Sequence, residues 1–420
     1  MKISVFEDGS FGNLYPLCML RGVFDIKIGP NTLLDRIKSV LGNKFDISLI
    51  SRNYLSDYLK EFHNLPVNSF SKDDYILLNG KVVFSEELMN IVLKEKNKDS
   101  VIYSDNDIVA VSLTKKNAES LFSLIKNSEP GVFNEVFISG LNLKKVIIQS
   151  DVKVNLINYP WDVIKYILNG GLIEDMSYNL KSSNKFFTLK KDGNFINIKE
   201  IFSKTKFSQP YNFILDASSG KIIISENVVI EPFTYIKGPV YIGSNVKIKS
   251  GSKIYGPCVI GEHSKVSGEI AESVFHSHVN KQHDGFTGHS YLCPFVNLGA
   301  DTVTSDLKNN YSEVKIIDGS NTFNSGMRFL GSIIGDHSKT SINTMLNTGS
   351  VIGIFANLFG GGFHEKYIYS FTWNESGKPF KNYDTEKAIQ TAKIVMDRRG
   401  LKMSKLYEKL INYYSESINS

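Results

Sequence analysis

Side chains able to do chemistry are concentrated in one stretch of the chain, residues 276–311. Four of the eight histidines lie at its start: His276, His278, His283 and His289. A neutral imidazole can bind a metal ion or accept a proton, so these residues are metal ligands, general bases or solvated loop residues. His289 is the best placed for a base. The sequence Gly-His-Ser-Tyr at 288–291 lies where a regular repeat resumes, and such a position can hold the ring rigidly.

The element expected to position His289 is a β-solenoid. Aliphatic side chains recur every six residues over one long stretch: Ile224, Ile230, Ile236, Ile242, Ile248, Ile254, Ile260 and Val266. This spacing differs from the helical period of about 3.6 and the strand period of 2, and it is typical of a coil with three flat sides. We expect loops to leave the coil where this spacing is interrupted. The first interruption lies between about 267 and 288. The spacing reappears at Leu292 and Leu298, and after a second interruption it returns from Ile334 to Leu358.

The first part of the chain alternates strand and helix patterns. Apolar runs at 3–6, 47–50, 75–78 and 108–111 predict strands, and amphipathic segments between and after them predict helices. This order indicates crossover connections and a mainly parallel sheet, with ligands bound at the carboxyl ends of the strands. The loop at 8–13 is where a phosphate is expected. We predict an α/β domain with its connection at 1–205, a β-helix at 206–375 and a helical segment at 376–420, which is a cap or a surface helix.

Composition narrows the classes of function. The 420 residues include 48 Lys and Arg against 43 Asp and Glu, giving a net charge of +5 with no basic run interleaved with aromatics. Nucleic acid is therefore not an expected partner. Three widely separated cysteines disfavour disulfides and structural zinc. No stretch has the ~20 apolar residues of a membrane span and the start lacks a signal peptide, so we expect a cytoplasmic protein.

Several motifs give the chain a family resemblance. They are Lys-Gln-His-Asp-Gly-Phe-Thr-Gly-His-Ser-Tyr-Leu at 281–292, Asn-Leu-Gly-Ala at 297–300, Ser-Asp-Leu-Lys-Asn-Asn-Tyr at 305–311 and Phe-Gly-Asn-Leu-Tyr-Pro-Leu at 11–17. Together they resemble the bacterial bifunctional enzymes that make UDP-N-acetylglucosamine, and more closely a divergent branch of that family. The resemblance implies an N-terminal nucleotidyltransferase-like domain and a left-handed parallel β-helix acyltransferase domain, assembled as a homotrimer.

The resemblance also implies roles in acyl transfer. His289 would take a proton from the amine of glucosamine 1-phosphate as that amine attacks acetyl-CoA. Substrate would be held by Lys281 through its phosphate, and through its sugar or amine by Tyr291, Asn309 and Asn310. The wall for acetyl-CoA would include Thr340, Ser341, Asn343 and Thr344.

In the N-terminal domain, the family pattern implies nucleotide binding by Gly9, Gly12, Asn13, Arg21 and Lys27, with Mg²⁺ as a possible cofactor. The sequence departs from the family here. Asn13 and Leu17 stand near the usual arginine and lysine, and Leu-Asn-Gly-Lys at 78–81 replaces the stretch with the metal-binding aspartate. No metal ligand is assigned.

Two other functions fit the same sequence. One is a nucleotidyltransferase whose β-helix serves only for assembly, and the other is a non-catalytic protein that binds sugar nucleotides. Release of coenzyme A from acetyl-CoA in the presence of amino sugars distinguishes the main hypothesis from both.

Overall fold

The computed structural model describes residues 1–181, 187, 189, 194–319 and 321–419. The chain forms two compact units. The first comprises Met1–Ile26, Asn31–Tyr159 and Ser404–Tyr414, and the second comprises Lys27–Pro30, Pro160–Met403 and Ser415–Ser420. Residues 182–186, 188 and 190–193, in the connection expected from the sequence, lie outside the described residues.

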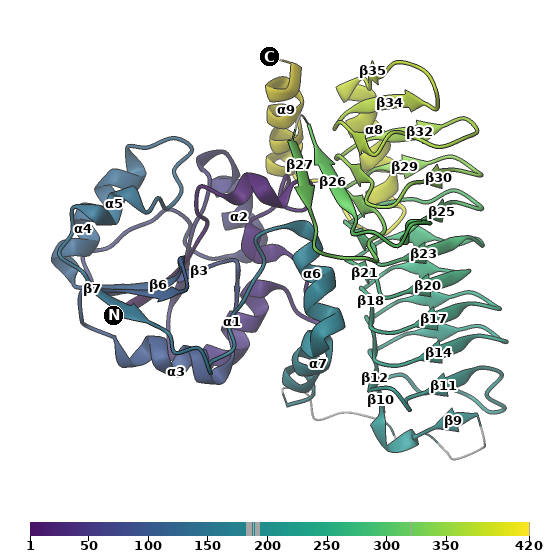
Figure 1. Cartoon of the computed structure of the whole chain (residues 1–420), viewed down its shortest axis with the longest axis horizontal. Coiled ribbons are helices and arrows are strands. Elements are labelled where there is room, and N and C mark those ends of the chain that lie inside the picture. The colour runs from purple at the N-terminus through teal and green to yellow at the C-terminus, as the bar shows by residue number, and fades with distance from the viewer. Residues whose placement is uncertain (182–186, 188, 190–193, 320, 420) are drawn as a thin grey trace. The chain divides into compact units, whose positions relative to one another are not determined.

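The first unit contains a six-stranded sheet (Figure 1). In spatial order its strands are β2 (Ile47–Ile50), β1 (Lys2–Phe6), β3 (Tyr75–Asn79), β6 (Asp107–Leu113), β5 (Ser100–Ser104) and β7 (Lys144–Ile147). The pairs of β1 with β2 and β3 are parallel, as is β5 with β7, but β6 runs antiparallel to both neighbours. The sheet is thus mainly parallel, as predicted, with β6 as the antiparallel strand, and β5 and β6 are joined without a crossover. They form a hairpin whose turn includes Asp105 at φ +51°, a conformation that aspartate tolerates.

Helices connect and cover these strands. They are α1 (Leu33–Leu41), α2 (Ser56–His63), α3 (Glu86–Lys94), α4 (Lys115–Lys126) and α5 (Val136–Ser139), and a two-strand pair is formed by β4 (Val82–Val83) and β8 (Asn155–Leu156). Thr32 caps α1 by accepting a hydrogen bond from the Asp35 backbone N–H at 3.1 Å. The last helix of the chain, α9 (Lys405–Asn419), contributes Tyr414 to this unit.

A buried ion pair fixes the chain where it leaves β1. The Glu7 and Arg52 side chains are both fully buried, and Arg52 Nη2 lies 2.9 Å from Glu7 Oε1. The same guanidinium donates to the carbonyls of Cys18 and Arg21 and to the Tyr414 hydroxyl. Because Glu7 immediately follows β1, this network holds the loop at the carboxyl end of the sheet.

The second unit is a β-solenoid made of three parallel sheets, whose strands stack as rungs in Figure 1. The first sheet contains β10 (Ile201–Ser203), β12 (Ile222–Ile224), β15 (Val240–Ile242), β18 (Cys258–Ile260), β21 (Val274–Phe275), β24 (Tyr291–Leu292), β28 (Ile333–Ile334), β31 (Val351–Ile352) and β33 (Tyr367–Ile368). The second contains β9 (Phe195–Ile196), β11 (Ile214–Asp216), β14 (Tyr235–Lys237), β17 (Lys253–Tyr255), β20 (Glu269–Ala271) and β23 (Phe286–Gly288), and beyond it β25 (Val303–Thr304) pairs with β30 (Met345–Leu346). The third contains β13 (Val229–Ile230), β16 (Lys247–Ile248), β19 (Lys265–Val266) and β22 (Asn280–Lys281), and on its later coils β29 (Lys339–Thr340), β32 (Asn357–Phe359), β34 (Thr372–Glu375) and the antiparallel β35 (Lys381–Asn382).

The six-residue rhythm of the sequence maps directly onto these sheets. Members of the series that are three positions apart pair with each other in neighbouring coils. Ile224, Ile242 and Ile260 therefore lie in register in the first sheet. Their side chains are fully buried. Removing such side chains from water is the main force that closes the coil. The β-solenoid predicted from the spacing is confirmed.

The expected loop between 267 and 288 is not present. Strands β20, β21, β22 and β23 occupy this stretch and stay in register with the coil below. Ile260 pairs with Phe275, a step of fifteen residues instead of the eighteen that separate Ile242 from Ile260. The corners are shorter here, so the period slips although the coil continues.

The segment that does leave the coil lies between β25 and β28. It forms an antiparallel hairpin of β26 (Lys315–Asp318) and β27 (Asn321–Asn324). Three helices also belong to this unit: α6 (Pro160–Tyr166), α7 (Leu172–Lys181) and α8 (Thr385–Asp397). Both α6 and α7 lie within the predicted range 1–205 of the first domain and its connection, and that boundary stays a prediction. Gly400, at φ +72°, follows the end of α8 and separates it from α9.

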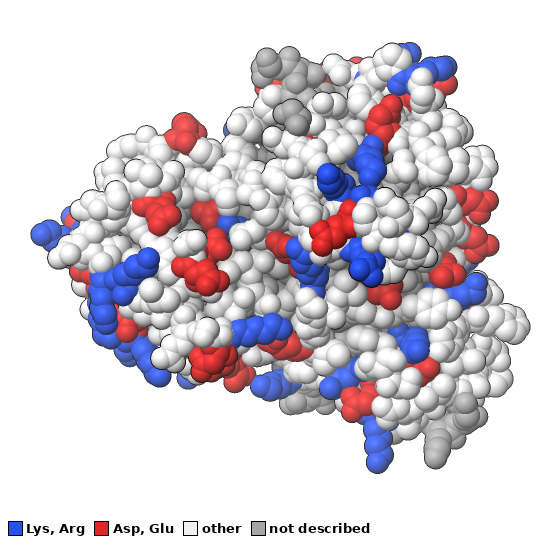
Figure 2. All heavy atoms as spheres, in the orientation of Figure 1, with Lys and Arg blue, Asp and Glu red and all other residues white. Residues whose placement is uncertain are grey.

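The charged surface has no field of a single sign on the face shown in Figure 2, where side chains of both signs are interspersed. Within the described residues, no helix has the length and apolar character needed to cross a bilayer.

Candidate functional site

His289 occupies a corner of the solenoid between β23 and β24. Its backbone is left-handed, with φ +46°, and is fixed from both sides. The His289 N–H donates to the Ala271 carbonyl, and its own carbonyl accepts from the Gly331 N–H, both at 3.0 Å. The preceding residue must be small, because a side chain at Gly288 would collide with the Asp306 carboxylate.

The imidazole is held by a carboxylate and an aromatic ring. His289 Nδ1 lies 2.8 Å from Asp306 Oδ2 and 3.9 Å from Glu272 Oε2. The Phe329 ring stacks on the imidazole with centroids 5.3 Å apart. The His289 side chain remains 12 % exposed, so the ring is neither sealed in nor freely mobile.

The segment between β25 and β28, residues 305–332, is an insertion into the coil that contains the β26–β27 hairpin. Both ends of this hairpin insertion contribute to the arrangement around His289. Asp306 lies where the chain leaves β25, and Phe329 lies where it returns toward β28. The two ends of the insertion meet here. The Leu330 N–H donates to the Asp306 carbonyl at 2.8 Å, and Leu307 forms a β-bridge with Phe329. The insertion therefore places both partners of the His289 ring.

Glu272 adds a second carboxylate at the same corner. Burial raises the pKa of Glu272 above its usual range, an effect that the nearby His289 opposes and Asp306 reinforces. A histidine with one close carboxylate on Nδ1 presents Nε2 as its proton acceptor. The corner can therefore accept and return a proton.

The four residues predicted to bind substrate differ in exposure: Lys281 and Tyr291 are buried, whereas Asn309 and Asn310 are exposed. The Lys281 side chain is 1 % exposed, and its ammonium group donates to the carbonyls of Ser267 and His283 at 2.9 and 3.0 Å. Burial lowers the pKa of Lys281 to about 8. Tyr291 is also 1 % exposed, and its hydroxyl accepts a hydrogen bond from the Lys27 N–H at 3.1 Å. Both side chains are enclosed.

Asn309 and Asn310 are exposed, on the insertion just beyond Asp306. The Asn310 side chain accepts a hydrogen bond from the Ser312 N–H at 3.1 Å. These two predicted substrate residues can reach solvent from the same insertion that holds the His289 ring.

Two of the four residues predicted to contact acetyl-CoA are buried inside the coil. Thr340 and Thr344 are buried, and their hydroxyls bond within the coil, to Thr302 at 2.7 Å and to the Ser341 carbonyl at 2.9 Å. Asn343 is exposed, and Ser341 is intermediate. Only the latter two present side chains to the outside of the coil.

One of the four clustered histidines, His278, lies in a stack of aromatic rings. His263, His278 and His337 stack with phenylalanines along one corner of the solenoid, with neighbouring ring centroids 4.7–4.9 Å apart between His263 and Phe355. Burial lowers the pKa of His278 to about 4, so this ring is neutral near pH 7. In the described parts of the chain, no group of three or more His, Cys, Asp or Glu residues is placed to hold a metal ion.

The first unit has a cavity of about 240 Å³ at the carboxyl ends of β1 and β3. Asp8, Gly9, Ser10, Asn79 and Lys81 line one part of it. Lys81 Nζ lies 2.9 Å from Asp8 Oδ2 and 2.6 Å from Ser10 Oγ. Burial opposes ionisation of Asp8, but the Lys81 ammonium holds the pKa of that carboxyl below its usual range.

The five residues predicted to bind nucleotide do not all gather at this cavity. Gly9 lines it, and Gly12 and Asn13 are exposed in the following 3₁₀ turn. Arg21 is 8 % exposed, and its guanidinium donates to the Leu17 carbonyl. Lys27 belongs to the second unit, where its ammonium lies 3.0 Å from Glu262.

Sequence reasoning missed Lys81 and Asp306 as site residues. Lys81 had a usable signal, since it follows the carboxyl end of a predicted parallel strand, where ligands bind. The sequence signal for Asp306 was weaker, because it consisted only of its position beside the Lys-Asn-Asn run. Periodicity does not show the hairpin that brings Phe329 close to Asp306.

Comparison with known proteins agrees with both units. Residues 3–177 match a family described as sugar nucleotidyl transferase, and residues 221–256 match the bacterial transferase hexapeptide repeat. A bifunctional sugar-1-phosphate nucleotidylyltransferase/acetyltransferase of Sulfurisphaera tokodaii is 28% identical over 304 residues, covering 69% of this chain and 74% of the relative. The bifunctional protein GlmU of Methanococcus maripaludis is 31% identical over 315 residues, covering 69% of this chain and 71% of the relative.

The α/β sheet with its cavity and the hexapeptide solenoid with its corner histidine define a transferase with a sugar nucleotidyltransferase part and a hexapeptide-repeat part. Within that class, the chain belongs to the GlmU family of bifunctional proteins.

Proposed function

We propose that this protein transfers an acetyl group from acetyl-CoA to the amine of an amino sugar phosphate, with glucosamine 1-phosphate as the substrate. The supporting observation is the pair formed by His289 and Asp306, whose side chains lie 2.8 Å apart at an accessible corner of the coil. The names of the relatives point to the same chemistry.

His289 acts as the general base in this proposal. The Asp306 carboxylate accepts the hydrogen on Nδ1, which leaves the lone pair of Nε2 for the substrate. The amine nitrogen attacks the thioester carbonyl carbon while Nε2 takes the proton that the nitrogen loses. The C–S bond then breaks, and the sulfur leaves as coenzyme A with that proton.

The insertion supplies the sugar contacts in this proposal. Asn309 and Asn310 are exposed beside Asp306, and amides can bond sugar hydroxyls. We assign the phosphate to Lys308 instead of the enclosed Lys281. Lys308 follows Asp306 on the same insertion, where an ammonium group can contact phosphate oxygens.

The second proposed activity is coupling of the acetylated sugar phosphate to UTP at the cavity of the first unit. Lys81 lies at the carboxyl end of β3, where an ammonium can contact phosphate oxygens. Asp8, Asp107 and Glu135 line the cavity, and the Asp8 carboxylate is paired with Lys81. Mg²⁺ is usually held by one or two carboxylates together with substrate phosphates. These carboxylates would hold such an ion beside the nucleotide, where it would offset the charge of the phosphates.

The experiment is an assay of coenzyme A release with acetyl-CoA and glucosamine 1-phosphate. We expect His289→Ala to abolish release, because no other imidazole is described at this corner. His283→Ala is the matched control, since His283 is an exposed histidine of a neighbouring segment. Full release by His289→Ala would refute the assignment of the base, and equal losses in both variants would refute its specificity.

Assembly as a homotrimer is proposed from an exposed apolar strip. Val303 and Phe363 flank Met345, which is bridged to both, and Ile342 lies nearby on the chain; these three outer residues are 36 %, 58 % and 67 % exposed. Such a strip is typical of a surface covered by another copy. Light scattering on the intact protein tests this, and a monomeric mass would refute it.

The same strip favours the second candidate function, a nucleotidyltransferase whose solenoid only mediates assembly. That alternative predicts no coenzyme A release by the wild type.

A further inference from the structure

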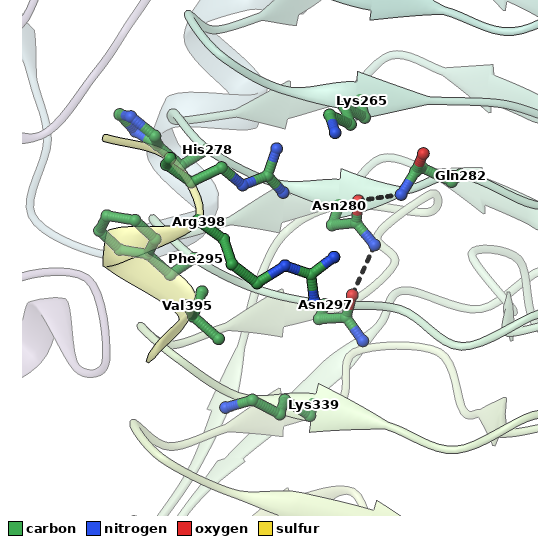
Figure 3. Close-up of a pocket in the computed structure, with 10 residues that line it drawn as sticks. Lys265, His278, Asn280, Gln282, Phe295, Asn297, Lys339, Val395 and Arg398 are labelled. Atoms are coloured by element: carbon green, nitrogen blue, oxygen red, sulfur yellow. Dashed lines mark hydrogen bonds between the residues drawn. The ribbon is translucent and has the colours of Figure 1, made fainter. Parts of the chain in front are cut away.

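A second polar cavity lies in the solenoid unit, between α8 and the third sheet (Figure 3). Its volume is about 240 Å³. The lining consists of Lys265, His278, Asn280, Gln282, Phe295, Asn297, Lys339, Val395, Arg398 and Arg399. Figure 3 shows Asn280 and Asn297 between Lys265 and Lys339, which lie on strands to either side, with Arg398 at the end of α8 facing the same space. This cavity contains neither His289 nor a residue of the insertion.

The lining carries four cations and no carboxylate. Lys265, Lys339, Arg398 and Arg399 come from three separate segments of the chain. Among the described residues, none of the four lies within ion-pair distance of an acidic side chain, although ion pairs satisfy Lys27 and Lys81 elsewhere. Four positive groups therefore face one small space without a counter-charge.

Burial and mutual repulsion make the charged forms of these groups less favourable. Burial lowers the pKa of Lys265 and Arg399, and the neighbouring Arg398 lowers both further. Burial alone lowers the pKa of Lys339 to about 8, and its ammonium donates to the His337 carbonyl at 2.8 Å. Each of these shifts has the direction that a bound anion would reverse.

Neutral donors point into the same space. Gln282 donates to the Asn280 carbonyl oxygen at 2.7 Å, and Asn280 donates to the Asn297 oxygen at 2.6 Å. This ladder occupies the oxygens of both asparagines and leaves the Asn297 amide hydrogens at its end (Figure 3). An amide nitrogen facing guanidinium groups needs an acceptor between them.

The other titratable groups near the cavity do not cancel its charge. His278 is neutral near pH 7, as its low pKa requires. Glu262, which also acts on His278, is paired with Lys27; burial would raise its pKa, but the Lys27 ammonium brings that pKa to about 2. Asp397 is exposed and does not line the cavity.

We propose that this cavity binds a small phosphate-class anion, inorganic pyrophosphate in preference to phosphate, at a site separate from acyl transfer. The cavity is smaller than the ~300–1,000 Å³ typical of pockets for drug-sized ligands, so it suits a free anion better than a whole nucleotide. Several guanidinium and ammonium groups favour the anion with more charge and more oxygens.

The test is isothermal titration of the full-length protein with sodium pyrophosphate and with sodium phosphate, in chloride buffer at constant ionic strength. We expect saturable binding of pyrophosphate, at least about tenfold tighter than phosphate. Arg399→Gln should weaken it at least about tenfold, the worth of one charge-assisted hydrogen bond. Lys387→Gln is the matched control, because Lys387 is an exposed cation of α8 outside the lining. No saturable binding, or equal affinity in the two variants, overturns the proposal.

Two further measurements separate this site from the proposed acyl transfer. At pH 8, anion binding should be accompanied by proton uptake at Lys339, seen as a dependence of the binding enthalpy on the buffer. The KM for acetyl-CoA should be unchanged in Arg399→Gln, and coenzyme A should not displace pyrophosphate. Displacement by coenzyme A with the same dependence on Arg399 would make the cavity part of the acyl-CoA path and refute a separate site. Loss of coenzyme A release in His289→Ala bears on the proposed function alone.

Discussion

Asp306→Asn is the substitution that most directly tests how the corner histidine works. The change removes the charge of the carboxylate but keeps nearly the same shape. In the structure, Asp306 Oδ2 lies 2.8 Å from His289 Nδ1 and fixes which ring nitrogen carries the hydrogen. An asparagine can present its NH₂ group to that nitrogen, which would favour the tautomer with the hydrogen on Nε2. That tautomer cannot accept a proton from the substrate amine.

The size of the effect follows from the geometry. The wrong tautomer removes the base, so the loss should match the contribution of a general base, about 10²–10⁴-fold. This corresponds to about 2.7–5.5 kcal/mol in the activation free energy. Glu272 Oε2, at 3.9 Å from the same nitrogen, can partly replace Asp306, so the double variant Asp306→Asn/Glu272→Gln should lose more than the single one.

The assay is steady-state release of coenzyme A, with kcat and KM measured separately for both substrates. We expect the loss in kcat, with KM nearly constant, because Asp306 acts through the imidazole and not on the substrate. Asp301→Asn, at an exposed carboxylate of the same coil, serves as the control and should retain full activity. Wild-type kcat in Asp306→Asn, or a loss confined to KM, would refute the argument that the carboxylate orients the base.

Other predictions address the buried charges and the insertion. Lys281 and Lys339 have pKa values of about 8, below the ~10.4 of an unfolded lysine, so the unfolded chain binds more protons between these pH values. The free energy of unfolding in urea should therefore rise more between pH 8 and 10 in the wild type than in a Lys281→Met/Lys339→Met variant, and equal slopes would contradict the buried positions. Glu7→Gln should lower the free energy of unfolding of the first unit by about 3–5 kcal/mol, because it leaves the Arg52 charge buried without its partner, whereas Gln at the exposed glutamate of α2 should change it little. Replacing 308–328 by a two-residue Asn-Gly turn should raise the KM for the sugar phosphate and leave the KM for acetyl-CoA unchanged; an unchanged sugar KM would show that the hairpin does not touch the sugar.

The solenoid was predictable because its determinant is repetitive and local. One aliphatic residue per flat side must point inward, and the spacing of Ile224, Ile242 and Ile260 records that requirement directly. The prediction of a loop near residue 267 was wrong for a physical reason. A corner can lose residues without breaking the hydrogen bonds of the sheets, so Ile260 still pairs with Phe275 although the period changes. Loss of period therefore indicated a shorter corner, not a loop.

The candidate site was only partly predictable, because its contacts are long-range. His289 could be singled out by its place at the resumption of the repeat. Its partners are Asp306 and Phe329, and no periodicity links the three. Lys281 and Tyr291 are a different case. The family resemblance implied substrate contacts for both, and that role stays a prediction. Both side chains are buried in the structure, and the spacing of residues along a sequence does not show which way a side chain points.

The two histidine-bearing corners show how one coil geometry serves different ends. His278 and His289 both adopt φ near +50°, the conformation that turns a corner outward. At the corner of His278, successive coils place aromatic rings above and below, so the imidazole is one layer of a stack and stays neutral. At the corner of His289, the hairpin insertion interrupts this regular succession and brings in a carboxylate and one ring. A repeat alone builds a scaffold, and the departure from the repeat gives one of its histidines the polar partner that proton transfer requires.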